Sequence, residues 1–75
     1  MKLLRVDINL YDRTQSDVQP IIEVQSLDEA IRKTFFKEGY DVEQYEVDNI
    51  LAEFVEKDNM FIADGDELST IFFKV

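Results

Sequence analysis

The segment LLRVDINLY, residues 3–11, decides the fold, because apolar and polar side chains alternate along it. A period of two predicts a half-buried β-strand. The apolar positions of this alternation are Leu4, Val6, Ile8 and Leu10. We therefore expect the first element of the chain to be a strand with one apolar and one more polar face.

A second strand is expected at residues 18–25, with Ile22 and Val24 facing inward. Pro20 has no backbone N–H to donate to a strand ladder, so this strand is expected at a sheet edge or to start after the proline. The polar residues 12–17 that separate the two segments predict that they pair as a hairpin.

A capped helix is predicted directly after this hairpin. Ser26 and Glu29 have the spacing of a capping box, in which each side chain accepts a hydrogen bond from the backbone N–H of the other residue. Apolar side chains then recur at helical spacing, at Leu27, Ala30, Ile31, Thr34 and Phe35. Gly39 can adopt the left-handed conformation that closes a helix.

A second helix is predicted to follow almost at once. Asp41 and Gln44 provide its expected cap, and Tyr40 and Tyr45 stand where a hydrophobic staple would place them. Its apolar face consists of Val47, Ile50, Leu51, Phe54 and Val55. Its opposite face carries Glu46, Asn49, Glu53 and Glu56.

The last part of the chain is predicted to form a second hairpin. Residues 60–63 and 68–75 are rich in β-forming side chains, and the dipeptide Asp64-Gly65 between them is a strong turn signal. Loops of two and three residues place Phe72 and Phe73 on opposite faces, so the sequence leaves the register of this hairpin open.

The element order β, β, α, α, β, β predicts one α+β domain over residues 1–75. We expect two layers, with both helices on one face of a four-stranded, mainly antiparallel sheet. The first 38 residues resemble the opening of the β-grasp (ubiquitin-like) fold, which implies a β-grasp-like topology. A second helix stands where ubiquitin continues with strands, and no diglycine follows Val75, so no conjugation function is carried over.

Composition restricts the chemistry that this chain can perform. It has 75 residues and contains no cysteine, histidine or tryptophan. A chain of this size builds one thin core with no room for an enclosed cofactor. It lacks the commonest acid-base side chain, a sulfur nucleophile and a glycine-rich phosphate loop. The acids around the Asp64-Gly65 turn do not have the spacing of a calcium loop. We therefore expect no enzymatic activity, no cofactor and no metal site.

The compartment can also be anticipated from composition. The absence of cysteine favours a reducing environment. No apolar run is long enough for a signal peptide or a membrane span. The sequence thus predicts a soluble cytoplasmic protein, in the host cytoplasm if its source is viral.

Negative charge is concentrated in the second half of the chain. Residues 1–37 hold six acids and six bases, whereas residues 38–67 hold eleven acids and the single base Lys57. Such a segment would repel a phosphate backbone, so direct binding of nucleic acid is not expected. The predicted partner-binding residues are Tyr40, Glu43, Tyr45, Glu46, Asp48, Glu53, Glu56, Asp64, Asp66 and Glu67.

These observations predict a non-enzymatic inhibitor whose acidic face occupies the basic groove of a nucleic-acid-handling enzyme, as a DNA mimic does. Long-range attraction to a basic cleft accelerates association, and carboxylates pair directionally with arginine. In size and charge the chain is similar to small acidic viral inhibitors of such enzymes, including anti-CRISPR proteins.

An alternative stays open: a small adaptor or structural module that binds through an edge strand or an apolar patch. Phe36, Tyr40 and Tyr45 are candidate contact residues of that module, and a homodimer is one form it could take. Salt separates the two hypotheses, because screening weakens an electrostatic complex far more than an apolar contact.

Overall fold

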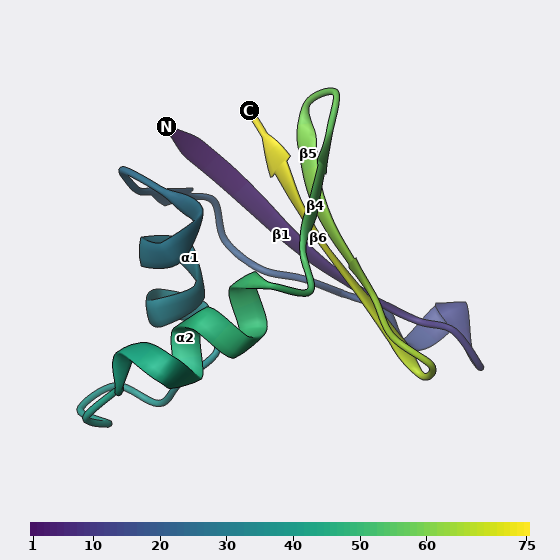
Figure 1. Ribbon diagram of the computed structural model, residues 1–75. Coiled ribbons are helices and arrows are strands. Elements are labelled where there is room, and N and C mark those ends of the chain that lie inside the picture. Colours follow the sequence, from purple (N-terminus) through teal and green to yellow (C-terminus); the bar gives the residue numbers. More distant parts are fainter.

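The chain folds into two layers, an antiparallel sheet and a pair of helices that lie on one of its faces (Figure 1). The structure is a computed structural model that describes all residues 1–75. Its elements in chain order are β1 (Lys2–Asn9), the 3-10 helix η1 (Arg13–Gln15), β2 (Asp17–Val18), β3 (Ile22–Glu23), α1 (Leu27–Thr34), α2 (Gln44–Leu51), β4 (Val55–Lys57), β5 (Met60–Asp64) and β6 (Leu68–Lys74). The predicted α+β class is confirmed.

The sheet has six strands where four were expected. Its order is β2-β1-β6-β5-β4, with β3 also paired to β1, and every pairing is antiparallel. Pro20 interrupts the expected second strand, so that segment meets β1 in two short pieces, Val18 opposite Val6 and Ile22 opposite Leu3. The other additional strand is β4, at the edge of the sheet. The resemblance to a β-grasp ends after α1, because α2 and the antiparallel strands β4, β5 and β6 follow.

The second helix is shorter than predicted. It ends at Leu51, and Val55 and Glu56 belong to β4 instead, opposite Ile62 and Phe61. The chain leaves β4 through a two-residue turn in which Asp58 has a φ of 54°. Aspartate tolerates this left-handed conformation, and the turn allows Val55 to pair within the sheet, where β-branched residues pack well.

The helix caps are partly as predicted. In α1 the Ser26 hydroxyl accepts a hydrogen bond from the Glu29 N–H at 3.2 Å, as predicted. The other half of the predicted capping box differs, because the Glu29 carboxylate accepts from the Gln25 N–H at 2.7 Å instead of from Ser26. The helix ends at Thr34, so Gly39, whose φ is +85°, lies in the following loop and does not close the helix itself. The N-cap of α2 is Glu43, not Asp41.

The core lies between the helices and one face of the sheet. Its fully buried side chains include Leu3, Ala30 and Phe72, and the predicted core residues Phe35 and Phe54 pack against them. The rings of Phe54 and Phe72 are 5.6 Å apart. This packing fixes the register that the sequence left open, because Phe72 faces the helices and the next residue faces away.

The face of β1 that the helices cover is the more polar one. Leu3, Arg5 and Asp7 are buried there. The alternate residues Leu4, Val6 and Ile8 point to the opposite side of the sheet. The Arg5 Nε lies 3.1 Å from the Asp7 carboxylate, and its Nη1 donates to the Thr34 carbonyl oxygen at 2.8 Å. The Thr70 hydroxyl donates to Asp7 at 2.9 Å. Because these partners satisfy both charges, the pair can be buried.

Candidate functional site: the acidic surface

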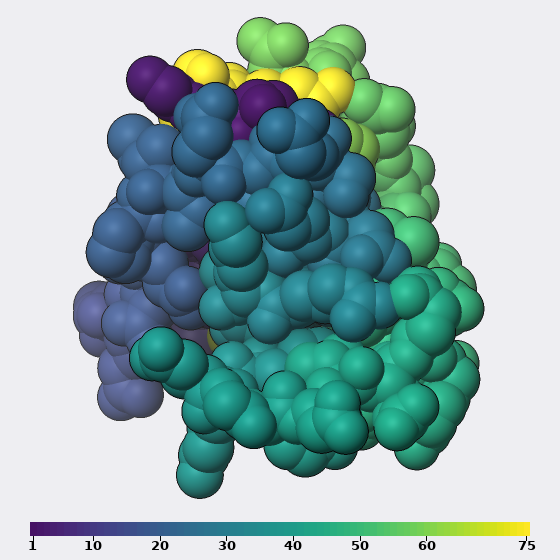
Figure 2. All heavy atoms as spheres, turned by 90° about the vertical axis from the view of Figure 1, so that its left-hand side faces the viewer, coloured from purple at the N-terminus to yellow at the C-terminus, as the bar shows by residue number.

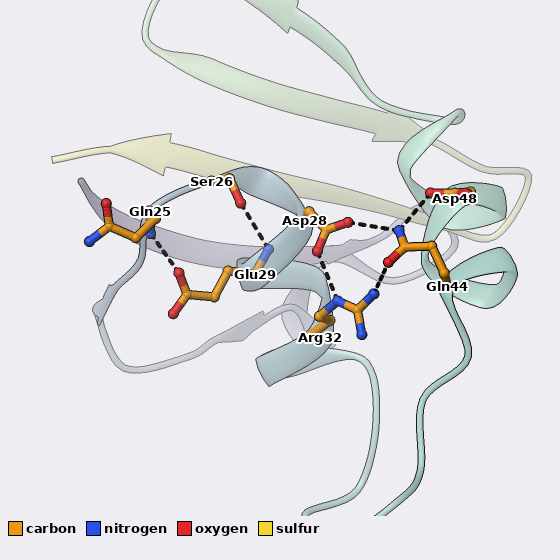
Figure 3. Close-up of polar contacts among 7 residues, drawn as sticks. All are labelled: Gln25, Ser26, Asp28, Glu29, Arg32, Gln44 and Asp48. Carbon is orange, nitrogen blue, oxygen red and sulfur yellow. Dashed lines mark hydrogen bonds and ion pairs between the residues drawn. The ribbon is translucent and has the colours of Figure 1, made fainter.

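A polar bridge holds α2 against α1 and thereby orients the acidic residues of α2 (Figure 3). Arg32 donates to Asp28 at 2.8 Å and also to the side-chain oxygen of Gln44. The Gln44 amide donates to Asp28 at 3.1 Å and to Asp48 at 2.9 Å. Asp48, a predicted partner-binding residue, is therefore engaged in this bridge.

The start of α2 gathers three of the predicted residues. The Glu46 carboxylate accepts hydrogen bonds from the Glu43 N–H at 3.0 Å and from the Tyr40 hydroxyl at 2.8 Å. These two donors, the backbone N–H first, lower the pKa of Glu46 below its usual range. The same hydrogen bond raises the pKa of Tyr40. Both shifts widen the pH range over which a charged Glu46 accepts the hydrogen bond of a protonated Tyr40.

The predicted aromatic staple does not form. The Tyr40 ring stacks in parallel on Phe36, with the ring centroids 5.6 Å apart, and does not pair with Tyr45. Tyr45 is 65% exposed. An exposed tyrosine beside a carboxylate cluster is a typical interface side chain, so both residues stay in the candidate site.

Glu53 and Asp64 are brought together by the tertiary structure. Glu53 follows the end of α2, Asp64 ends β5, and both line one shallow depression of about 370 Å³. Lys57 lies at the same depression. The eight residues of α2 span about 12 Å, and Glu53 lies two residues beyond the end of the helix. The acidic surface therefore extends from the start of α2 to the β5-β6 turn.

The remaining predicted residues take two different positions. Asp66 and Glu67 are exposed in the turn between β5 and β6. Glu56 lies in β4 and forms an ion pair with Lys74, so it does not share the stripe expected for a longer helix. We define the acidic surface as the residues Glu43, Glu46, Glu53, Asp64, Asp66 and Glu67.

Most of the negative charge has no cationic partner. Of the eleven acids between residues 38 and 67, Glu56 alone forms an ion pair. Three of the six bases of the first half are engaged elsewhere: Arg32 and Lys33 pair within α1, and Arg5 is buried. Figure 2 shows α1 and α2 side by side in front of the strands. Ten carboxylates therefore have no cationic partner within the chain, although those of Glu46, Asp48 and Asp64 accept internal hydrogen bonds.

A second hollow lies between α2 and the sheet. It measures about 270 Å³, and its lining is mostly apolar, with Phe35, Ile50 and Phe54 on the helix side and Leu68 on the sheet side. Glu53 is its only charged residue. No group of three or more acidic side chains is arranged to hold a metal ion. Neither helix has the length and apolar composition needed to cross a bilayer.

Comparison of this chain with family models, curated proteins and solved structures gives no match.

Sequence reasoning did not anticipate two features of the surface. One is the ion pair of Glu56 with Lys74, which joins residues 18 positions apart on β4 and β6, the two strands that flank β5. The other is the identity of the uncovered sheet face. The alternation in residues 3–11 signalled that the strand has two faces, but it carried no information on which face the helices would cover.

Proposed function

We propose that this chain is a non-enzymatic binding protein whose acidic surface occupies a basic groove on a protein that handles nucleic acid. The observation that carries the proposal is the set of ten carboxylates without a cationic partner, concentrated in residues 38–67. Unpaired carboxylates raise the local negative potential, which attracts a basic cleft and accelerates association.

The arrangement of the acids supports mimicry of a phosphate backbone. The acidic surface follows α2 over about 12 Å, includes Glu53 just beyond the end of the helix, and continues to the β5-β6 turn. A groove that binds phosphates presents Lys and Arg side chains along a comparable length. Carboxylates offer those side chains charge-assisted hydrogen bonds, so the partner is inhibited because its nucleic-acid groove is blocked.

The rigidity of α2 also supports binding by a preformed surface. The Arg32, Asp28, Gln44 and Asp48 bridge ties α2 to α1, and the Glu46 carboxylate closes the first turn of α2. A surface that is already ordered loses little conformational entropy on binding. The proposal therefore needs no folding transition in this chain.

The test is a pair of charge reversals that leave the fold intact. Glu53→Lys with Glu67→Lys changes two exposed acids that form no ion pair. The matched control is Asp17→Lys with Glu23→Lys, which changes the net charge equally on two exposed residues of the opposite sheet edge. Each variant is immobilised and exposed to extract of the native cell at about 50 mM salt, where screening is weak.

The proposal expects the wild-type chain and the control to retain nucleic-acid-binding proteins that duplex DNA then elutes. The Glu53 and Glu67 variant should lose them, and about 500 mM salt should release them from the wild type. Retention that survives both this variant and high salt would refute the proposal. That result would favour an adaptor with an apolar contact surface.

A further inference from the structure

A row of β-branched side chains crosses the whole sheet on the face that the helices leave uncovered. The strand registers place its members side by side in the order Val18, Val6, Ile71, Ile62 and Val55. A second apolar row runs beside it through Leu4, Phe73 and Met60, and Ile8 extends the patch along β1. We call these nine side chains the open sheet face.

The open sheet face is exposed to solvent. Figure 1 shows both helices on the other side of the sheet. Val18 and Val55, at the two ends of the row, are 67% and 66% exposed, and none of the other seven is buried. On the same strands Leu3 and Phe72, which face the helices, have no exposure at all.

The accessible surface of the whole chain is consistent with a missing cover. It measures 5305 Å². A folded monomer of 8.8 kDa is expected to expose about 4,800 Å². The excess of roughly 500 Å² is similar in size to the largest apolar patches of monomeric proteins, which are often functional.

The charge around the open sheet face points to a partner of the same kind. Its rim carries Lys2 and Lys57 against Glu23, Asp64 and Glu53, and Glu53 lines a depression together with Val55 and Ile62 of this face. The rim therefore has a charge of only -1 in a chain whose net charge is -9. A basic partner would be drawn to the acidic surface instead. A second copy presents the same apolar rows and the same nearly neutral rim, as a two-fold interface requires.

The dimensions of the face also suit a second copy. The five strands of the row hold 25 residues, which at about 3.3 Å per residue and about 4.8 Å between strands give a face of about 400 Å² in projection. Two such faces bury at least about 800 Å² in total, and the relief of a pleated face raises this toward the lower end of stable interfaces at about 1,200 Å². Sheets with β-branched inner faces pack against each other about 10 Å apart.

We propose that the open sheet face is the interface of a homodimer, in which two copies pack sheet against sheet. This arrangement adds a second apolar layer between the two sheets and leaves the helices on the outside. Glu43 and Glu46, at the start of α2, then lie away from the other copy, whereas Glu53 and Asp64 lie at the edge of the interface. The proposal does not depend on the function of the acidic surface.

The test is the mass of the chain in solution, measured by sedimentation from about 1 to 200 µM, because dimerisation depends on concentration through mass action. The wild type should reach twice 8.8 kDa. Ile71→Lys, at the centre of the row, should raise the dissociation constant more than about 30-fold, as expected for a central interface residue. Ala52→Lys, an equal change in charge at the exposed end of α2, should leave it unchanged.

Other occupants of the face give different results. A wild-type chain that stays monomeric over the whole range overturns the proposal and assigns the face to another molecule. A dimer that is insensitive to Ile71→Lys also overturns it, because pairing through the β4 edge would behave in this way. If Ile71→Lys does not fold, Val18→Lys at the exposed end of the row tests the same contact.

Salt separates this proposal from the acidic-surface proposal. The homodimer should persist at about 500 mM salt, since screening weakens the repulsion between two negative chains and leaves apolar contacts in place. A complex through the acidic surface should dissociate there. A homodimer that dissociates at high salt would contradict the sheet interface, whatever the acidic surface binds.

Discussion

Replacing Arg5 by methionine should destabilise the fold more than any other single change of a charged residue. Arg5 is 8% exposed and its guanidinium lies 3.9 Å above the centroid of the Phe35 ring. It donates to Asp7 and to the Thr34 carbonyl oxygen. Methionine fills similar space but donates nothing, so the buried Asp7 carboxylate keeps only the Thr70 hydroxyl as a side-chain partner.

The expected loss is about 3–5 kcal/mol, the usual result of removing one partner of a buried ion pair. A chain of 75 residues has a free energy of unfolding of about 4–11 kcal/mol. The variant should therefore lose at least about a quarter of its stability. Arg13→Met is the matched control, because Arg13 is exposed and forms no ion pair, and it should stay within about 0.5 kcal/mol of the wild type.

Urea denaturation followed by circular dichroism measures these differences. The double variant Arg5→Met with Asp7→Leu should recover most of the loss, since an apolar pair of similar volume often matches a buried ion pair. Both single variants and the double variant together give the coupling free energy of the pair. An Arg5→Met variant within 1 kcal/mol of the wild type, as expected for an exposed ion pair, would refute this account of the core.

Three further changes test other parts of the structure. Glu46→Gln should lower the pKa of Tyr40 toward its ordinary value of 10.0, because the carboxylate that raises it is gone; the Tyr40 ring resonances followed against pH measure this, and an unchanged titration contradicts the contact. The pKa of Asp28 is lowered from 3.8 by hydrogen bonds from Arg32 first and Gln44 second, so its contribution to stability is complete above the unfolded-state pKa and is lost as pH falls through the folded-state pKa. Asp28→Asn should therefore make the free energy of unfolding fall less steeply below about pH 4, and urea midpoints that decline in parallel with the wild type would argue against the bridge. Gly65→Ala should destabilise the β5-β6 turn, because the added Cβ would lie 2.7 Å from the Leu68 carbonyl oxygen; thermal unfolding measures the loss, and an unchanged midpoint would show that the turn can relax.

Local signals in the sequence were sufficient for the elements that local chemistry stabilises. The Ser26 and Glu29 capping box marked the start of α1, and the apolar spacing that followed it put Phe35 in the core. These signals depend on neighbours within one helical turn. The end of α2 was misplaced because Val55 fits an apolar helix stripe and a strand equally well, and its pairing with Ile62 is a contact between separate segments.

The acidic surface divides in the same way. The concentration of acids between residues 38 and 67 is a property of the sequence. Tertiary contacts decided which of these acids has a cationic partner, since Lys74 pairs with Glu56 across the sheet. They also decided which acids lie near one another, since Asp64 and Glu53 line the same depression. Charge can be counted along the chain, but pairing needs distances in space.

The strand at residues 3–11 shows most directly what only the tertiary structure could decide. Its sequence by itself determined that the strand has one apolar and one more polar face, but not which of them the helices would cover. The helices cover the more polar face, where Arg5 and Asp7 pair with each other and contact Thr34, Thr70 and Phe35. Those partners lie at the end of α1 and in β6, far along the chain from β1. The interactions that offset the cost of burying two charges therefore exist only once the fold has formed.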